Sequence, residues 1–104
     1  MNLKRMSDQA IVKEIGNRIR KQRLLQNYSQ SELATRAGIS ISTMQKLEYG
    51  TASTIKTVIQ ALRVLGKLES LNNFIPEPKP SPIEMAIFEG KQRKRASKRN
   101  NKLK

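Results

Sequence analysis

Residues 30–48, QSELATRAGISISTMQKLE, decide the fold, because their spacing predicts two short helices joined by a tight turn. Ser29 is placed to cap the first helix, and Glu32, three residues later, completes a capping box. Gly38 follows the first helix where a left-handed residue is needed, so we expect a sharp turn there. Ser40 then caps the second helix. The apolar positions expected to face inward are Leu33, Ala37, Ile39, Met44 and Leu47.

The outer, N-terminal side of the second helix carries short polar side chains, one isoleucine and one lysine. These residues are Ser40, Ile41, Ser42, Thr43, Gln45 and Lys46. Hydroxyls, an amide and an ammonium at the positive end of a helix suit base edges and phosphates, because their donors differ in reach. The same residues would also serve as the ordinary polar surface of a small helical domain. The motif alone is therefore a hypothesis for DNA binding.

Length and charge narrow the class of protein. A chain of 104 residues, 37% of them hydrophobic, suffices for one modest core plus tails. The formal net charge of +13 favours a polyanionic partner: DNA, RNA or, less readily, an anionic membrane surface. Residues 91–104 hold eight basic side chains and no acid, so residues 1–90 keep 13 basic against 8 acidic side chains.

The chain contains no cysteine and no histidine. This composition argues against zinc fingers, thiol nucleophiles, disulfides and the usual general base, so we expect no enzyme, no metal and no cofactor. The first residues, MNLKRMSDQ, lack the apolar stretch of a signal peptide, and no apolar run approaches the roughly 18 residues of a membrane span. We expect a soluble, cytoplasmic protein.

The segment before the central stretch predicts one helix. Residues 1–6 form a loose, flexible basic end, and Ser7 is placed to cap a helix that runs to about Gln26. Gly16 inside this helix costs roughly 1 kcal/mol relative to alanine, which packing should override. Asn27 is suited to end the helix in the left-handed conformation. Isoleucines recur every four residues on the face that we expect to be buried, at Ile11, Ile15 and Ile19.

The segment after the central stretch predicts two more helices. Ser53 is placed to cap the fourth helix, and Gly66 to end it. A short fifth helix is expected near 67–73, after which Phe74 and Ile75 close a domain that spans residues 7–75. The apolar stripe of the fourth helix is Ile55, Val58, Ile59, Leu62 and Leu65.

Residues 76–81 form a Pro-rich linker. Prolines at 76, 78, 80 and 82 alternate with other residues, which favours an extended conformation. Ser81, Pro82 and Glu84 then predict a short amphipathic helix over 82–90. We expect Gly90 to end it and the basic tail, residues 91–104, to be disordered. The helix is apolar enough to dock on its own domain, a second subunit or another protein.

Residues from about Ile15 to Leu65 resemble the helix-turn-helix family of phage Cro and repressor proteins, the xenobiotic-response-element (XRE) family. The closing signature is Leu47-Glu48-Tyr49-Gly50, and the motif positions matched are Gln30, Ala34, Gly38, Met44 and Leu47. The resemblance implies an all-α, five-helix, lambda-repressor-like domain. It also implies a buried salt bridge between Arg23 and Glu48.

By that resemblance, the second motif helix reads DNA in the major groove. Phage repressors place glutamines where this chain has Ile41 and Ser42; Ile41 suits a thymine methyl, and Lys46 suits guanine O6 and N7. The base-reading positions implied are Ile41, Ser42, Gln45 and Lys46. The positions implied for phosphates or flanking bases are Gln30, Ser40, Thr43, Ser53, Thr54 and Lys56.

The C-terminal third is similar to repressor subunits encoded beside HipA-type serine/threonine kinases, the HipB-type antitoxins. The segments that carry this likeness are 68–74, Ile75-Pro76-Glu77-Pro78, Ser81-Pro82 and Gln92-Arg93-Lys94-Arg95-Ala96. The likeness implies a homodimeric autorepressor that binds a palindromic, double-stranded DNA operator and the kinase toxin. Tail residues implied to contact DNA or the partner are Lys91, Arg93, Lys94, Arg95, Lys98 and Arg99.

Three alternatives stay open at this point. A phage-type repressor or restriction controller would bind DNA without a toxin partner. A non-specific DNA- or RNA-binding protein would rely on the tail, but the chain has only four aromatic residues for stacking: Tyr28, Tyr49, Phe74 and Phe88. A protein-interaction module would use the motif only as a scaffold, which the basic charge and the lack of acids between Ser40 and Leu47 disfavour.

Overall fold

The computed structural model describes residues 2–79 and 81–103, with side chains as far as Gln92. Those residues contain six α-helices and no strand, which confirms the all-α prediction. The elements are η1 (Leu3–Arg5), α1 (Asp8–Leu25), α2 (Gln30–Ala37), α3 (Ile41–Tyr49), α4 (Ile55–Leu65), η2 (Leu68–Ser70), α5 (Leu71–Phe74) and α6 (Pro82–Leu103). The chain divides into two units between Leu71 and Asn72.

Helix α1 begins and ends where the sequence predicts. The Ala10 amide donates to the Ser7 side chain at 3.1 Å, which makes Ser7 the N-cap. Asn27, two residues after the helix, has a φ of 59°. The left-handed asparagine that ends α1 is therefore confirmed.

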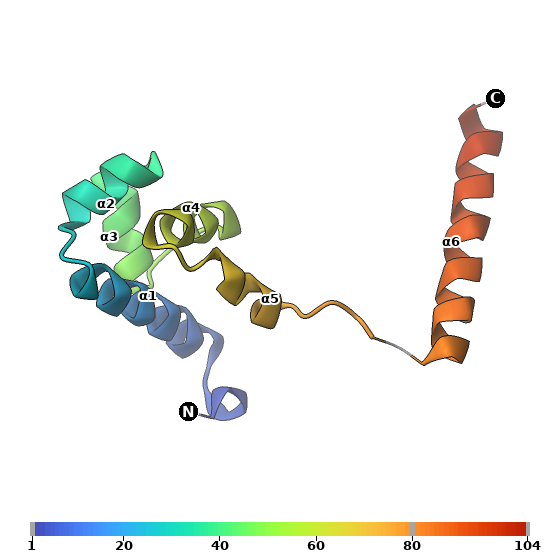
Figure 1. Cartoon of the computed structure of the whole chain (residues 1–104), viewed down its shortest axis with the longest axis horizontal. Coiled ribbons are helices and arrows are strands. Elements are labelled where there is room, and N and C mark those ends of the chain that lie inside the picture. The colour runs from blue at the N-terminus through green and yellow to red at the C-terminus, as the bar shows by residue number, and fades with distance from the viewer. Residues whose placement is uncertain (1, 80, 104) are drawn as a thin grey trace. The chain divides into compact units, whose positions relative to one another are not determined.

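Helices α2 and α3 form the predicted pair (Figure 1). The capping box of α2 is present: the Glu32 amide donates to Ser29 Oγ at 3.0 Å, and the Ser29 amide donates to Glu32 Oε1 at 3.4 Å. Gly38 ends α2 with a φ of 73°, a conformation that a side chain would strain. Ser40 then caps α3, because its Oγ accepts the Thr43 amide at 3.0 Å.

The core lies among the first four helices, and α3 packs against both α1 and α2 (Figure 1). Ile15, Tyr28, Ile39, Val58 and Val64 are partly buried against this core. The inward face predicted for α2 and α3 is therefore confirmed. The core residues are Ile19, Leu33, Ala34, Met44, Leu47, Ala61 and Leu65.

Gly16 has a packing role that the pattern of α1 does not reveal. A Cβ at this position would lie against the carbonyl oxygen of Leu47 and 2.7 Å from that of Glu48. The backbone of α1 thus approaches the end of α3 too closely for any side chain. Gln9 adds a bond at the same crossing, where its Nε2 donates to the Gly50 carbonyl.

The cap of α4 corrects one prediction. The Thr57 amide donates to Thr54 Oγ1 at 3.2 Å, so the N-cap is Thr54 and not Ser53. Both side chains can cap a helix, and the one that caps α4 directly precedes Ile55. Ile55, predicted to lie on the buried stripe, is exposed at the first helical position.

The end of the first unit also differs from the expectation. Two short pieces, η2 and α5, stand where one fifth helix was predicted. Phe74 and Ile75 are exposed, so they do not close the core as expected. The four long helices already bury the core cluster, and the prolines that begin at Pro76 leave no room for another helical turn.

In the second unit, helix α6 is longer than predicted. It begins as expected, with the Glu84 amide on Ser81 Oγ at 3.3 Å and the Ser81 amide on Glu84 Oε2 at 3.1 Å. The helix does not end at Gly90 as predicted, because α6 runs to Leu103, and the disorder expected of the basic tail stays a prediction. The lysines, arginines, glutamine and alanine after Gly90 are good helix formers and outweigh the roughly 1 kcal/mol that one glycine costs.

Candidate nucleic-acid interface

A buried ion pair holds α3 against α1. Arg23 Nε donates to Glu48 Oε2 at 2.7 Å, and Arg23 Nη2 donates to Glu48 Oε1 at 3.0 Å. Both residues are buried. The third guanidinium nitrogen, Nη1, donates to the Tyr28 carbonyl at 2.7 Å. The two parallel bonds fix the orientation of α3 relative to α1 and to the loop before α2.

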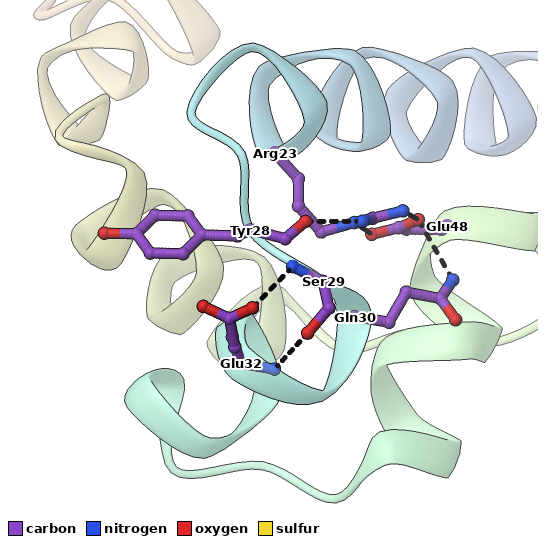
Figure 2. A network of polar contacts seen from close by, with 6 residues as sticks. All are labelled: Arg23, Tyr28, Ser29, Gln30, Glu32 and Glu48. Atoms are coloured by element: carbon purple, nitrogen blue, oxygen red, sulfur yellow. Dashed lines mark hydrogen bonds and ion pairs between the residues drawn. The ribbon is translucent and has the colours of Figure 1, made fainter.

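The same carboxylate positions the first residue of α2. Gln30 Nε2 donates to Glu48 Oε1 at 3.1 Å, and its side-chain oxygen points away from Glu48 (Figure 2). A carboxamide nitrogen carries two hydrogens, so one donor of Gln30 is left for a phosphate. Sequence reasoning placed Gln30 at the interface but did not anticipate this bond, which links residues 18 positions apart.

The residues implied to read bases are all exposed on α3. Ile41, Ser42, Gln45 and Lys46 lie on the surface, while Met44, Leu47 and Glu48 are buried on the other side of the helix. Ser42, Gln45 and Lys46 are three and four positions apart and form one stripe. The structure therefore leaves these four side chains together on one accessible helix surface.

Tyr49 extends this stripe and was not among the predicted site residues. It is the last residue of α3, seven positions after Ser42, and is 70% exposed. The sequence analysis treated it as part of the closing signature and as one of few aromatics. Counting the helical period onward from Ser42 would have placed it on this face.

The start of α3 holds two predicted contact residues in one cap. Ser40 Oγ and Thr43 Oγ1 share a hydrogen bond at 2.8 Å, besides the amide bond of the cap. The first turn of α3 contains no acidic residue. The positive end of the helix dipole is therefore not offset by a carboxylate in that turn.

The start of α4 repeats this arrangement. Thr54 Oγ1 and Thr57 Oγ1 lie 3.1 Å apart, and Ser53 Oγ donates to the Thr54 carbonyl at 3.3 Å. Lys56 is exposed in the first turn, which again has no acid. The predicted contacts Ser53, Thr54 and Lys56 thus gather at one helix N-terminus.

The basic residues of the former tail belong to α6. Lys91 is exposed on this helix. The side chains of Arg93, Lys94, Arg95, Lys98 and Arg99 lie outside the described ones, although their backbone is helical. Two findings concern the described residues alone: no group of three or more carboxylates is placed to hold a metal ion, and no helix is long and apolar enough to cross a bilayer.

Comparison with known proteins places this site in a family. The model of the family described as Helix-turn-helix matches residues 19–70, half of the chain. No curated protein matches the chain. The matched part includes the Arg23–Glu48 pair, the α2–turn–α3 unit and the start of α4. The chain therefore belongs to the helix-turn-helix family of the XRE type, a family of DNA-binding transcription regulators.

Proposed function

We propose that this protein is a repressor that binds a palindromic operator as a homodimer. The observation that carries the proposal is the exposed, acid-free surface of α3, held from behind by the buried Arg23–Glu48 pair. A twofold dimer places α3 of each subunit in successive major grooves, about 34 Å apart. The symmetry of the operator then follows from the symmetry of the dimer.

Base reading falls to the exposed residues of α3. Ile41 contacts a thymine methyl group, and Lys46 donates to O6 and N7 of a guanine. Ser42 and Gln45 donate to or accept from neighbouring base edges. The four residues have different chemistry, which is what a sequence-selective surface needs.

Phosphate contacts come from helix N-termini, because their amides and dipole attract anions. Ser40 and Thr43 serve this role at α3, and Ser53, Thr54 and Lys56 at α4. The second donor hydrogen of Gln30 contacts a phosphate beside α2. The basic residues of α6 add affinity that depends on salt and carries little sequence information.

We further propose that this repressor is the antitoxin of a HipA-type kinase. The similarity of residues 68–96 to HipB-type subunits supports this assignment. Binding of a purified HipA-type kinase from the same genome, measured by calorimetry, tests it. Tight operator binding without kinase binding would favour a phage-type repressor or a restriction controller.

Selection of bound sites from random duplexes tests the DNA-binding proposal. We expect one palindromic consensus whose half-sites are one helical turn apart. Replacing Lys46→Ala should weaken binding to that site by about 1–3 kcal/mol and relax the preference at one base pair. Lys79→Ala, which removes an exposed lysine of the linker, is the matched control. If Lys46→Ala lowers affinity equally for operator and random DNA, Lys46 does not read bases.

A further inference from the structure

The end of α1 exposes two adjacent leucines in a basic setting. Leu25 is 77% exposed and Leu24 48% exposed. Arg20 and Lys21 precede them by one helical turn, and both are exposed. We refer to Leu24, Leu25, Arg20 and Lys21 together as the leucine patch.

The end of α4 contacts the end of α1 and carries further positive charge. Gln26 Nε2 donates to the Leu65 carbonyl at 2.8 Å, so the residue after Leu25 touches the last turn of α4. Arg63 and Lys67 lie on either side of Leu65 in the chain, and both are exposed. Exposed leucines with several cations nearby suit an apolar segment that carries acids.

The first half of α6 is a segment of this kind. Ile83 is 74% exposed, and Ile87 and Phe88 are also exposed. Ile83 and Ile87 are four positions apart and share one face of the helix. Glu84 and Glu89 are the charged residues of this half, and the first basic residue of α6 is Lys91. Its charge is therefore opposite in sign to that of the leucine patch.

We propose that the first half of α6 from one copy of the chain binds the leucine patch of a second copy. The contact covers Leu24 and Leu25 with Ile83, Ile87 and Phe88, and it sets Glu89 among the cations of the patch. This inference rests on the homodimer in the proposed function and gives that dimer a surface. None of the residues involved belongs to α3 or to the start of α4, so the contact leaves those two surfaces free to bind DNA.

The linker favours exchange between copies over docking within one chain. Prolines at 76, 78, 80 and 82 alternate with other residues, a spacing that favours an extended, semi-rigid spacer. Such a spacer suits a binding site in a second copy. Two copies that exchange α6 make the same contact twice around one twofold axis and so form a closed dimer.

Cross-linking between single-cysteine variants tests this contact, because the chain has no cysteine of its own. Leu25→Cys and Ile87→Cys proteins are mixed in equal amounts without DNA, treated with a short bis-maleimide and analysed by mass spectrometry. We expect the mixed 25–87 product well above its statistical share. Thr35→Cys, at an exposed position on α2, replaces Leu25→Cys in the control and should give the mixed product only at that share. Both tested positions are exposed, so the variants should fold, which circular dichroism checks.

Each other outcome overturns the proposed contact in a distinguishable way. A statistical mixture of products would mean that α6 and the leucine patch do not meet. An internal cross-link in a chain that carries both cysteines, with no cross-linked dimer, would mean that α6 docks on its own domain. Sedimentation of the unmodified protein separates the two proposals: a dimer with statistical cross-linking leaves the homodimer standing, whereas a monomer removes both.

Discussion

Helices α2 and α3 begin with the same cap geometry and differ in the third residue after the cap. The caps Ser29 and Ser40 have nearly the same backbone angles (φ −72°, ψ 163° and φ −71°, ψ 156°). Each side chain accepts the amide three residues later at 3.0 Å. That third residue is Glu32 in α2, whose carboxylate returns to the cap amide, and Thr43 in α3, whose hydroxyl pairs with Ser40 Oγ (Figure 2 shows the α2 cap).

The difference shows how one cap can serve two purposes. A carboxylate in the first turn stabilises a helix by offsetting the positive end of its dipole, but it also repels a phosphate. Helices α1, α2 and α6 have an acid there: Asp8, Glu32 and Glu84. Helices α3 and α4 have none, and at these two we propose that the capping residues at the helix start contact phosphates, whereas α2 contributes only the side chain of Gln30. The first turns of α3 and α4 therefore lack a stabilising carboxylate, and their amides can bind an anion.

The largest expected effect concerns the carboxylate that both motif helices share. Glu48→Ala leaves Arg23 buried without its partner and removes the bond to Gln30, so we expect unfolding free energy to fall by about 3–5 kcal/mol. Urea denaturation measures this loss of unfolding free energy. The control is Glu14→Ala, which breaks the exposed pair with Arg18 and should cost at most about 1 kcal/mol. Similar small losses for both variants would mean that the buried pair does not anchor α3.

The next largest effect is expected from a substitution that gives the first turn of α3 the acidic residue that α2 has. Thr43→Glu should stabilise the protein by about 0.3–1 kcal/mol, because the new carboxylate lies at the dipole's positive end. It should also weaken operator binding about tenfold, or about 1.4 kcal/mol, through repulsion of a phosphate. The reverse change, Glu32→Thr, should lower stability slightly and leave DNA affinity unchanged. Undiminished binding by Thr43→Glu would remove the α3 start from the DNA interface.

The smallest expected effect distinguishes the roles of the two capping serines, Ser29 and Ser40. Ser29→Ala and Ser40→Ala should each reduce unfolding free energy by about 1 kcal/mol, because their cap bonds have the same length. Only Ser40→Ala should also weaken DNA binding, by about 0.5–1.5 kcal/mol for one lost hydrogen bond. Thermal unfolding and fluorescence anisotropy of a labelled operator measure the two quantities. Equal losses of DNA affinity for both variants would contradict the distinction between the two helix starts.

The sequence by itself determined the features that depend on neighbouring residues. A serine three positions before a glutamate makes a capping box, a glycine after a helix permits the left-handed turn, and apolar side chains at helical spacing mark the buried face. These rules located α2, α3, the turn at Gly38 and most of the core. The exposed face of α3 followed, because a helix that buries Met44 and Leu47 must expose Ser42, Gln45 and Lys46.

Only the tertiary structure decided what depends on distant segments. The close approach of α1 to the end of α3 explains Gly16, and the bond from Gln30 to Glu48 joins two helices across the motif. Thr54 caps α4 instead of its neighbour Ser53, although both residue types can cap a helix. In each case a local preference is small or degenerate, and contacts or cumulative effects beyond a few residues decide the outcome.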